Sequence, residues 1–289
     1  MRVPVTLLLL ASCAGSAASS SHSVAPLSLA ADERMIAIAA GKYIAGSTPE
    51  ERAAAYDDYQ ASSGHDTARE HQWFEHEQPR HPATLPAFRI DLMPVTQAQF
   101  AEFVAAGQAP PPTIDEPAWR AQGFQQDYVT QVSRYLWKDG RPPVGREDHP
   151  VVLVTEGEAS QYCKWRGMQR GGVRRLPTAD EYEKAARGDG GLAYPWGNSY
   201  EPDNLNSAVK GPKDTMPAGS FPHGASPYGV LELAGNVFEW TSTEYATGQA
   251  AVKGSAWDDW GGVGRGAYTH GRDPTARHVI VGFRCAADR

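Results

Sequence analysis

The sequence predicts a chain of short helices and short strands in which much of the backbone is irregular. Its 289 residues include 29 Gly, 22 Pro and 8 Trp, which is typical of many turns around large buried side chains rather than of long helices. Strand-like and helix-like segments alternate without an internal repeat. The length is enough for one large domain or two small ones.

The N-terminal segment indicates export. Arg2 precedes a short apolar run at 3–10 and a stretch of small residues, a pattern typical of a signal peptide and too short to span a bilayer. The residues up to Cys13 also resemble a bacterial lipobox, in which Cys13 would be lipidated and become the mature N-terminus. The alternative is an ordinary cleavable signal that ends near Ala17 or Ala18.

The lipobox interpretation divides the chain into a signal peptide at 1–12, a flexible tether at 13–34 and a folded domain at 35–289. The tether is rich in Ser and Ala and has few large apolar residues, a composition that does not fold by itself. We therefore expect a periplasmic lipoprotein of a Gram-negative bacterium that touches the membrane only through its lipid anchor.

The charge of the chain argues against nucleic acid and anionic membranes as partners. The formal net charge is −7, with 27 Lys and Arg against 34 Asp and Glu, and the basic residues do not cluster. We expect a small molecule, a peptide or a periplasmic protein as the partner instead.

The first half of the folded part predicts two strand regions, each followed by a helix. Residues 35–47 alternate small and β-branched side chains, as an edge hairpin would. A helix is expected at 49–59 with Thr48 as its N-cap. Residues 83–96 are strand-like, and the amphipathic segment that follows predicts a helix that ends before Gly107.

The second half predicts two further helices and then mostly turns. Residues 108–148 show no sustained periodicity and predict a long ordered loop. A buried strand is expected at 151–154, followed by a helix that carries Cys163. The segment 177–187 predicts a helix with a capping box, and the chain beyond it predicts turns and short strands.

The stretch AGNVFEWTS at 234–242 raises a problem of charge. Gly235 and Asn236 tolerate positive φ and predict a turn, and the apolar residues after them favour a strand. Glu239 lies among those apolar residues, where an unpaired carboxylate is costly to bury. A cation, an Arg or backbone N–H groups must compensate it.

Several segments in this order resemble the sulfatase-modifying-factor family, which contains the formylglycine-generating enzymes. The segments are MIAIAAGKYIAGS, HPATLPAFRIDLMPVTQAQFAEFV, HPVVLVTEGEASQYCKWRGM, RRLPTADEYEKAARG, YPWGN, GVLELAGNVFEWTS, KGSAWDD and VGFRCA. Together they extend from Met35 to the C-terminus. The resemblance implies an α+β, C-type-lectin-like fold with a low content of regular secondary structure.

The resemblance also implies one structural Ca²⁺ in the 232–239 turn. Its ligands would be two carboxylates and three backbone carbonyls, from Glu232, Glu239, Leu233, Gly235 and Val237. Calcium accepts six to eight oxygen ligands and often mixes these two kinds. A second family site near Asn206 is not expected, because Lys210 and Lys213 stand where an acidic ligand is needed. A Glu239 carboxylate satisfied by backbone N–H groups is the alternative.

The cysteines of the folded domain bear on the chemistry. In the family, the residues equivalent to Cys163 and Cys285 form a disulfide, which suits an exported protein. Family oxidases hold copper(I) with another Cys pair, and soft thiolates are what copper(I) requires. Here Asp258 stands at the first of those positions, and the second falls near Val263. We therefore expect neither copper nor formylglycine formation by the copper mechanism.

The segment 255–272 keeps many polar and aromatic residues where the copper pair would stand. Candidate catalytic residues are Asp258, Tyr268, His270 and Arg272. Candidate substrate-binding residues are Ser255, Trp257, Asp259, Trp260 and Arg265. Asp or His would exchange protons and Trp would stack on a ring, whereas His65, His71, His76 and His81 match no common metal-ligand spacing and are expected on the surface.

These residues leave two functional hypotheses, and turnover itself remains open. The first is an oxidoreductase-like maturation factor acting on a small molecule or peptide, comparable to copper-free exported relatives that mature the siderophore pyoverdine. The second is a non-catalytic lipoprotein that binds a protein or glycan with a lectin-like surface. An open pocket with Asp258, Tyr268 and His270 converging would favour the first hypothesis.

Overall fold

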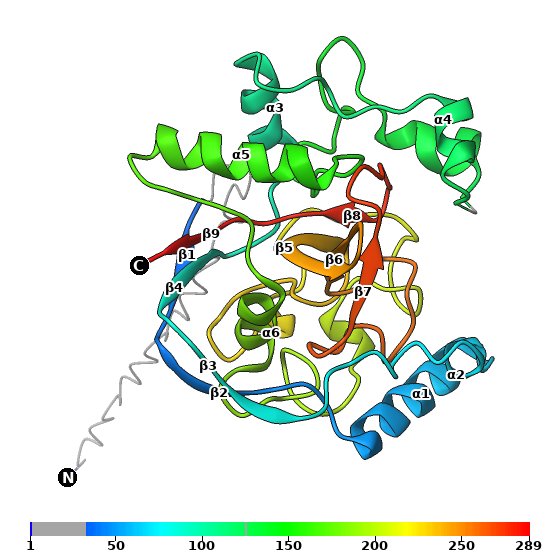
Figure 1. Cartoon of the computed structure of the whole chain (residues 1–289), viewed down its shortest axis with the longest axis vertical. Coiled ribbons are helices and arrows are strands. Elements are labelled where there is room, and N and C mark those ends of the chain that lie inside the picture. The colour runs from blue at the N-terminus through cyan, green and yellow to red at the C-terminus, as the bar shows by residue number, and fades with distance from the viewer. Residues whose placement is uncertain (2–32, 125) are drawn as a thin grey trace.

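The computed structural model describes Met1 and residues 33–124 and 126–289 (Figure 1). The predicted signal peptide, the lipidation site Cys13 and nearly all of the predicted tether lie outside these residues. Glu33, which the sequence places in the tether, forms ion pairs with Arg166 and Arg170. Contacts with the folded domain therefore include Glu33, two residues before Met35.

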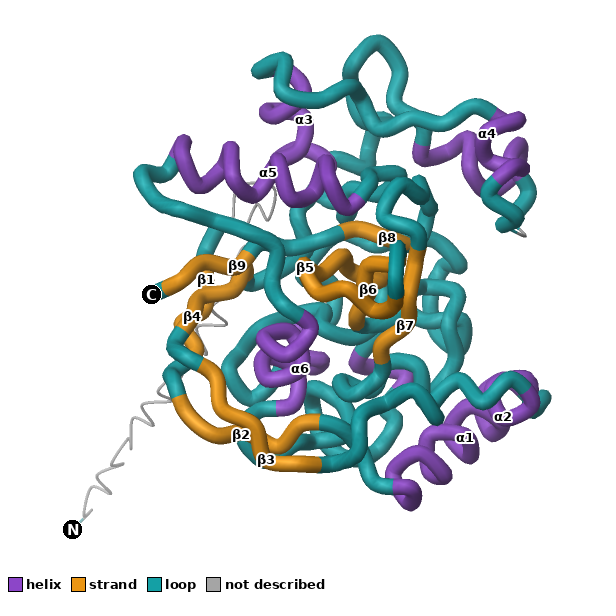
Figure 2. The backbone as a smooth tube through the Cα atoms, viewed as in Figure 1, coloured by secondary structure: helices purple, strands orange, loops and turns teal. Residues whose placement is uncertain are grey.

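The described part of the chain is a mixture of short helices, short strands and long connecting segments (Figures 1 and 2). The α-helices are α1 (Pro49–Ser63), α2 (Thr67–Glu70), α3 (Gln97–Ala105), α4 (Glu116–Ala121), α5 (Glu156–Gln169) and α6 (Ala179–Arg187). The shorter helical turns are η2 (Tyr128–Val132), η3 (Ser133–Tyr135), η4 (Pro202–Asn204) and η5 (Pro222–Gly224). None of the helices in the described ranges is long and apolar enough to cross a membrane.

The strands form small sheets rather than one large one. They are β1 (Met35–Ile38), β2 (Gly41–Ala45), β3 (His81–Leu85), β4 (Phe88–Asp91), β5 (Phe238–Ala246), β6 (Gln249–Lys253), β7 (Thr269–Arg272), β8 (Val281–Gly282) and β9 (Ala286–Asp288). The sheet orders within the described residues are β1-β4-β9, β2-β3 and β7-β6-β5-β8. Strands β5 and β8 pair in parallel, and the other pairs are antiparallel.

The last strand closes the domain against its first ones. Strand β9 pairs with β4, which in turn pairs with β1, so both ends of the folded part lie at one side of the molecule (Figure 1). Helix α5 runs above this sheet, and the disulfide between Cys163 of α5 and Cys285 fastens the two. The disulfide implied by the family resemblance is confirmed.

The main core is aromatic and lies between α3, α5 and the β5-containing sheet. Phe100 stacks on Tyr162 and meets Phe283 edge to face, and all three are buried. Trp240 of β5 is fully buried and donates its indole N–H to the Val154 carbonyl. Aromatic pairs of this kind add to the stability gained from burial, which explains how a domain with little regular structure is held together.

Several local predictions are confirmed. Thr48 and Thr178 each form a full capping box at the start of a helix, because their hydroxyls accept the N3 N–H while the N3 Glu accepts the N-cap N–H. The turn before β5 has φ of 83° at Gly235 and 67° at Asn236. Helix α3 ends two residues before Gly107, whose φ is 69°.

The strand predicted at 151–154 is wrong, although these residues are buried. Leu153 has a positive φ of 61°, which interrupts any extended run. The backbone hydrogen bonds of this segment do not form a ladder with one strand. The Val151 N–H donates to the Val95 carbonyl, and the Leu153 N–H donates to the His278 carbonyl. The apolar run reflects burial in the aromatic core. Periodicity alone does not distinguish a buried strand from another buried segment.

Candidate functional site

Strand β7 and the loop before it form one wall of a cavity of about 410 Å³. The opposite wall comes from the segment after α2. The lining residues are His71, Trp73, His76, Phe238, Tyr245, Asp258, Asp259, Tyr268, Thr269, His270, Arg272 and Ile280. The four predicted catalytic residues, Asp258, Tyr268, His270 and Arg272, therefore face one space, and the predicted substrate-binding residue Asp259 lies with them.

Asp258 and Asp259 are neighbouring carboxyl groups recessed in this cavity. Asp258 accepts a hydrogen bond from Gln126 Nε2 at 3.3 Å through Oδ2, and its buried Oδ1 has no partner in the described part of the chain. Asp259 Oδ2 accepts from the Ala256 N–H at 2.7 Å. Burial raises the pKa of both carboxyl groups, and the Asp258 charge raises the pKa of Asp259 further. The pair thus favours holding a proton.

His270 presents a neutral imidazole to the same space. Burial, reinforced by the nearby Arg272 charge, lowers the pKa of His270 to about 3. Its ring meets Phe238 edge to face at 4.7 Å, and its buried Nδ1 makes no hydrogen bond to any described residue. A neutral imidazole can accept a hydrogen bond from a ligand.

Arg272 and Tyr268 supply donors to the cavity. The Arg272 guanidinium lies over the Phe124 ring at 5.5 Å, and its buried Nε lacks a partner within the described ranges. Burial lowers the pKa of Arg272. Burial and the Asp259 charge raise the pKa of Tyr268, so its hydroxyl stays protonated.

Arg272 also lines a second, larger cavity of about 880 Å³. This neighbouring space lies between α4 and the segment 271–277. Phe124 and Gln249 belong to its lining but not to that of the first cavity. Arg272 therefore forms the common wall of two cavities, and a long ligand in one would pass it to reach the other.

Four of the predicted substrate-binding residues do not line the Asp258 cavity. Ser255 is buried, and its Oγ accepts the Gly235 N–H. Trp257 lies buried under the Arg134 guanidinium, and Trp260 meets His65 edge to face. Arg265 forms a buried ion pair with Glu77. In a loop without regular periodicity, sequence spacing does not determine which side chains face the same way.

The wall that faces β7 was not predicted from the sequence. His71 and His76, expected only as surface residues, are exposed side chains at the cavity, and Trp73 lies between them. They come from a polar segment nearly 190 positions before Asp258, with no local pattern that marks them. Among the described residues, no group of three or more His, Cys, Asp or Glu is arranged to hold a metal ion.

The 232–239 turn shows what compensates Glu239. Arg284 Nε and Nη2 each donate to a different Glu239 carboxylate oxygen at 2.7 Å, and Tyr182 donates to one of them at 3.3 Å. The premise of the calcium prediction, that Glu239 otherwise lacks a partner, is therefore wrong. Of the three alternatives for this carboxylate, the structure shows an Arg.

Two of the other predicted calcium ligands, the Glu232 carboxylate and the Gly235 carbonyl, are also engaged. Glu232 Oε1 accepts the backbone N–H groups of Gly219 and Ser220, and Oε2 accepts the Asn236 amide. The Gly235 carbonyl accepts the Val237 N–H. Calcium would have to share these oxygens with protein donors, so the donor set fits the ion less well than the resemblance implies. Calcium in this turn stays a prediction.

The residues at the two family copper positions do not fit copper(I). Asp258 offers a hard oxygen ligand, and Val263 is a buried apolar side chain. The two cysteines in the described part of the chain are joined to each other. No thiolate is therefore offered to a soft ion at this site.

Comparisons with known proteins agree with this architecture. The family described as "Sulfatase-modifying factor enzyme 1-like domain" matches residues 22–289. The chain is 32% identical over 252 residues to "Inactive C-alpha-formylglycine-generating enzyme 2" of Bos taurus, covering 73% of this chain and 80% of that protein. It is 29% identical over 261 residues to "Hercynine oxygenase" of Mycolicibacterium smegmatis, covering 78% of this chain and 58% of that protein.

Solved structures show the same fold. The structure of PvdO from Pseudomonas aeruginosa superposes with a TM-score of 0.65 at 19% identity, covering 88% of this chain and 94% of that one. At this level of identity the likeness concerns the fold alone. The predicted α+β fold of the formylglycine-generating enzymes is confirmed, and the chain belongs to the sulfatase-modifying-factor family.

Proposed function

We propose that this protein is an exported, oxidoreductase-like maturation factor that acts on a polar small molecule or peptide in the Asp258 cavity. The observation that carries the proposal is the set of buried, unpartnered polar atoms there. Asp258 Oδ1, His270 Nδ1 and Arg272 Nε have no hydrogen-bond partner among the described residues, and all three side chains line one cavity. Buried polar groups are usually satisfied, so a ligand is the natural partner.

The cavity also suits a ligand with an aromatic ring. Trp73, Phe238 and Tyr245 line it and offer faces or edges to a ring. The unpartnered Arg272 Nε would donate to a carbonyl or hydroxyl oxygen on that ligand. The ring and the polar group together define the substrate class.

The cavity's own groups would move protons at the bound ligand. The Asp258–Asp259 pair has raised pKa values and can take up or return one proton between its two carboxyl groups. The neutral His270 ring can accept a hydrogen bond from the reacting group. Tyr268 stays protonated and can donate its hydroxyl hydrogen to the ligand. These are the tasks of an acid–base site that would take protons from a polar ring or side chain while a separate two-electron acceptor, such as dioxygen, takes up the electrons and is reduced.

The relatives support the oxidoreductase-like class without specifying the substrate. One is named an oxygenase of hercynine, and another is named an inactive formylglycine-generating enzyme. A chain without the copper cysteines fits a reaction different from formylglycine formation. The alternative, a purely lectin-like binding protein, is less favoured because the polar residues converge in a recessed cavity rather than on a flat face.

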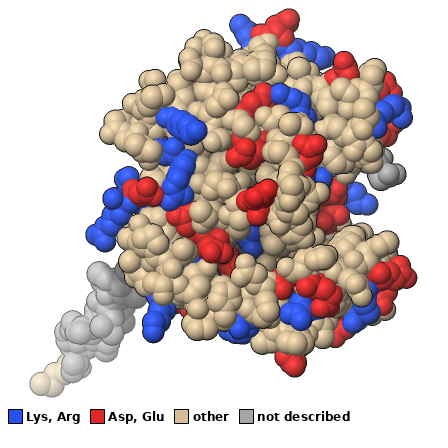
Figure 3. Space-filling view, viewed as in Figure 1, with Lys and Arg blue, Asp and Glu red and all other residues tan. Residues whose placement is uncertain are grey.

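The cellular location is part of the proposal. We propose that Cys13 is lipidated and holds the domain at a periplasmic membrane surface. On the face in Figure 3, acidic and basic side chains lie beside one another, so this face offers no patch of one charge as an alternative anchor. Labelling cells with a radioactive fatty acid should mark the native protein, whereas Cys13→Ser should leave it unlabelled. An unlabelled native protein would instead indicate ordinary secretion.

Metabolite comparison tests the enzymatic role. A strain that lacks the gene should accumulate a compound that differs from its mature form by added hydrogen, detected by untargeted mass spectrometry. Asp258→Asn and His270→Gln should fail to restore the mature compound. The control Asp203→Asn, whose exposed carboxylate pairs with Lys210, should restore it. Full restoration by both cavity variants at normal protein levels would contradict the proposal and favour the binding protein.

A further inference from the structure

A third cavity of about 250 Å³ lies between α1 and the segment 190–198, away from the Asp258 site. Its lining residues are Glu51, Ala54, Ala55, Asp58, Arg80, Gly190, Gly191, Leu192, Ala193, Tyr194, Asn198 and Arg265. None of them lines the Asp258 cavity. Any ligand of this space is therefore independent of the proposed reaction.

Arg265 offers this cavity an unused pair of donors. Its side chain is 2% exposed, and its Nη1 donates to both carboxylate oxygens of Glu77 at 2.9 and 3.1 Å. Its Nη2 is buried without any hydrogen-bond partner in the part of the chain that the structure describes. A buried guanidinium N–H without a partner costs free energy, so an occupant that accepts from Nη2 would be stabilised.

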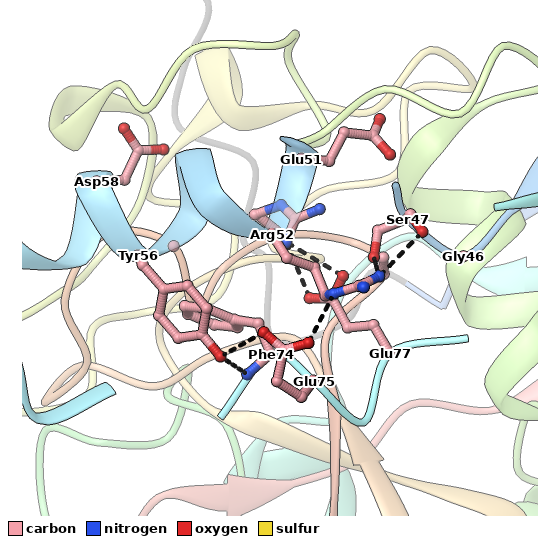
Figure 4. Close-up of polar contacts among 12 residues, drawn as sticks. Gly46, Ser47, Glu51, Arg52, Tyr56, Asp58, Phe74, Glu75 and Glu77 are labelled. Carbon is pink, nitrogen blue, oxygen red and sulfur yellow. Dashed lines mark hydrogen bonds and ion pairs between the residues drawn. The ribbon is translucent and has the colours of Figure 1, made fainter. Parts of the chain in front are cut away.

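Asp58 offers the cavity an acceptor. Its Oδ2 accepts the Tyr194 hydroxyl at 2.7 Å, which leaves Oδ1 for an occupant. Figure 4 shows Asp58 and Glu51 projecting from the same side of α1, away from Tyr56. Burial raises the pKa of Asp58, although the Tyr194 hydrogen bond and the Arg265 charge act against this.

The two acidic and two basic side chains that line the cavity balance in charge, so they give an ionic ligand no net attraction. Glu51 and Asp58 would repel an anion, while Arg80 and Arg265 would repel a cation. Glu51 and Arg80 already neutralise each other at 2.5 Å. The favoured occupant is therefore neutral and carries an acceptor and a donor close together.

Part of the remaining wall is apolar. Ala54, Leu192 and Ala193 supply small aliphatic surface beside the polar groups. The space is also smaller than the roughly 300–1,000 Å³ of a site for a drug-sized ligand. An occupant should thus be a single small ring with one polar edge and one C–H face.

We propose that this cavity binds one neutral sugar ring through two adjacent hydroxyl groups. One hydroxyl accepts from Arg265 Nη2, and its neighbour donates to Asp58 Oδ1, which suits the dual capacity of hydroxyl groups. The C–H face of the ring packs on Ala54 and Leu192. The site would let an exported domain dock on a glycan while the Asp258 cavity remains open.

Ligand-observed NMR with the intact secreted domain tests this site. The probes are the methyl glycosides of mannose, glucose and galactose, and hydroxymethyl-tetrahydropyran is the control that lacks adjacent hydroxyls. At least one glycoside should show saturation transfer, and the control should show none. Asp58→Asn should weaken binding about tenfold or more, whereas Asp57→Asn, on an exposed side chain outside the cavity, should not.

Two alanine variants test the site without changing the buried ion pair between Arg265 and Glu77. Ala54→Phe places a ring in the cavity and should abolish glycoside binding. Ala53→Phe changes the adjacent exposed residue, which does not line the cavity, and should leave binding unchanged. Equal binding by the Ala54→Phe and Ala53→Phe proteins would overturn the proposal. Absence of transfer from all three glycosides, or specific binding of phosphate or acetate instead, would overturn it as well.

Discussion

Arg284 and Glu239 form a fully buried, bidentate ion pair. The guanidinium Nε and Nη2 each lie 2.7 Å from a different carboxylate oxygen. The same guanidinium donates to main-chain carbonyls of Asp91, Leu92, Leu231 and Glu232. Arg284 therefore joins the segment near the end of the chain both to β5 and to the turn before it. Each of the two buried charges is therefore compensated by the other, without contact with solvent.

Breaking this pair from one side should strongly destabilise the domain. Glu239→Gln leaves a buried guanidinium without its counter-charge, a change that typically costs about 3–5 kcal/mol. For a domain of this size, thermal unfolding followed by circular dichroism should show a melting temperature lower by roughly 10 °C.

A double substitution provides the control for this prediction. Glu239→Gln combined with Arg284→Met removes both charges and should be less destabilising than the sum of the two single changes, because the residues are in contact. Additive effects, or an unchanged melting temperature in Glu239→Gln, would show that the pair contributes little.

Calcium in the 232–239 turn is a separate prediction. If one Ca²⁺ binds there, elemental analysis should find one ion per chain, and removal by a chelator should lower the melting temperature by mass action. Glu232→Gln should reduce this calcium effect while leaving the Arg284 pair intact. If the chelator changes neither the native protein nor the variant, Arg284 alone compensates Glu239.

The turn also shows how far the sequence predicts this molecule. Local patterns determined local structure, as at the Thr48 and Thr178 capping boxes and at Gly235 and Asn236. They identified Glu239 as a buried charge in need of a partner. They did not identify Arg284, which lies 45 positions away, because only tertiary packing brings the two segments together.

The candidate site shows the same limit. Residues on the short strand β7 and the adjoining loop were predicted to share a cavity, and the carboxyl pair, Tyr268, His270 and Arg272 do so. Trp257 and Trp260 were predicted to bind substrate because of their residue type. The irregular backbone instead directs them to Arg134 and His65. The opposite wall around Trp73 has no signal in its own sequence, since its role depends on packing against β7.

Asp91 makes the stability of the domain depend on pH. Its carboxyl group accepts the Cys285 N–H, and burial raises its pKa to about 6. Between pH about 4 and 6, this group ionises in the unfolded chain while it stays protonated in the folded one. Its contribution to stability is therefore fully present below pH about 4 and is lost as pH rises to 6, by about 3 kcal/mol in total.

Denaturant unfolding at a series of pH values measures the contribution of Asp91 to the free energy of unfolding. Relative to Asp91→Asn, which cannot ionise, the native protein should lose stability between pH 4 and 6. The control Asp139→Asn, at an exposed turn position with positive φ, should follow the native curve. Parallel curves for the native protein and Asp91→Asn would mean that Asp91 is ionised in both states throughout this range.

The last prediction concerns copper. The copper mechanism of the family needs two thiolates, whereas the family resemblance places Asp258 at the first position and the second position near the buried Val263. A carboxylate and an aliphatic side chain do not retain copper(I) against soft competitors. Protein purified after exposure to copper(I) and dialysis against a thiol buffer should therefore contain no stoichiometric copper by elemental analysis. It should also leave a sulfatase-type cysteine peptide unchanged by mass spectrometry, while an active formylglycine-generating enzyme converts the same peptide in parallel. Stoichiometric copper together with an aldehyde product would show that oxygen and imidazole ligands in the Asp258 cavity replace the thiolates, and would place Asp258 and His270 at the metal rather than at a proton.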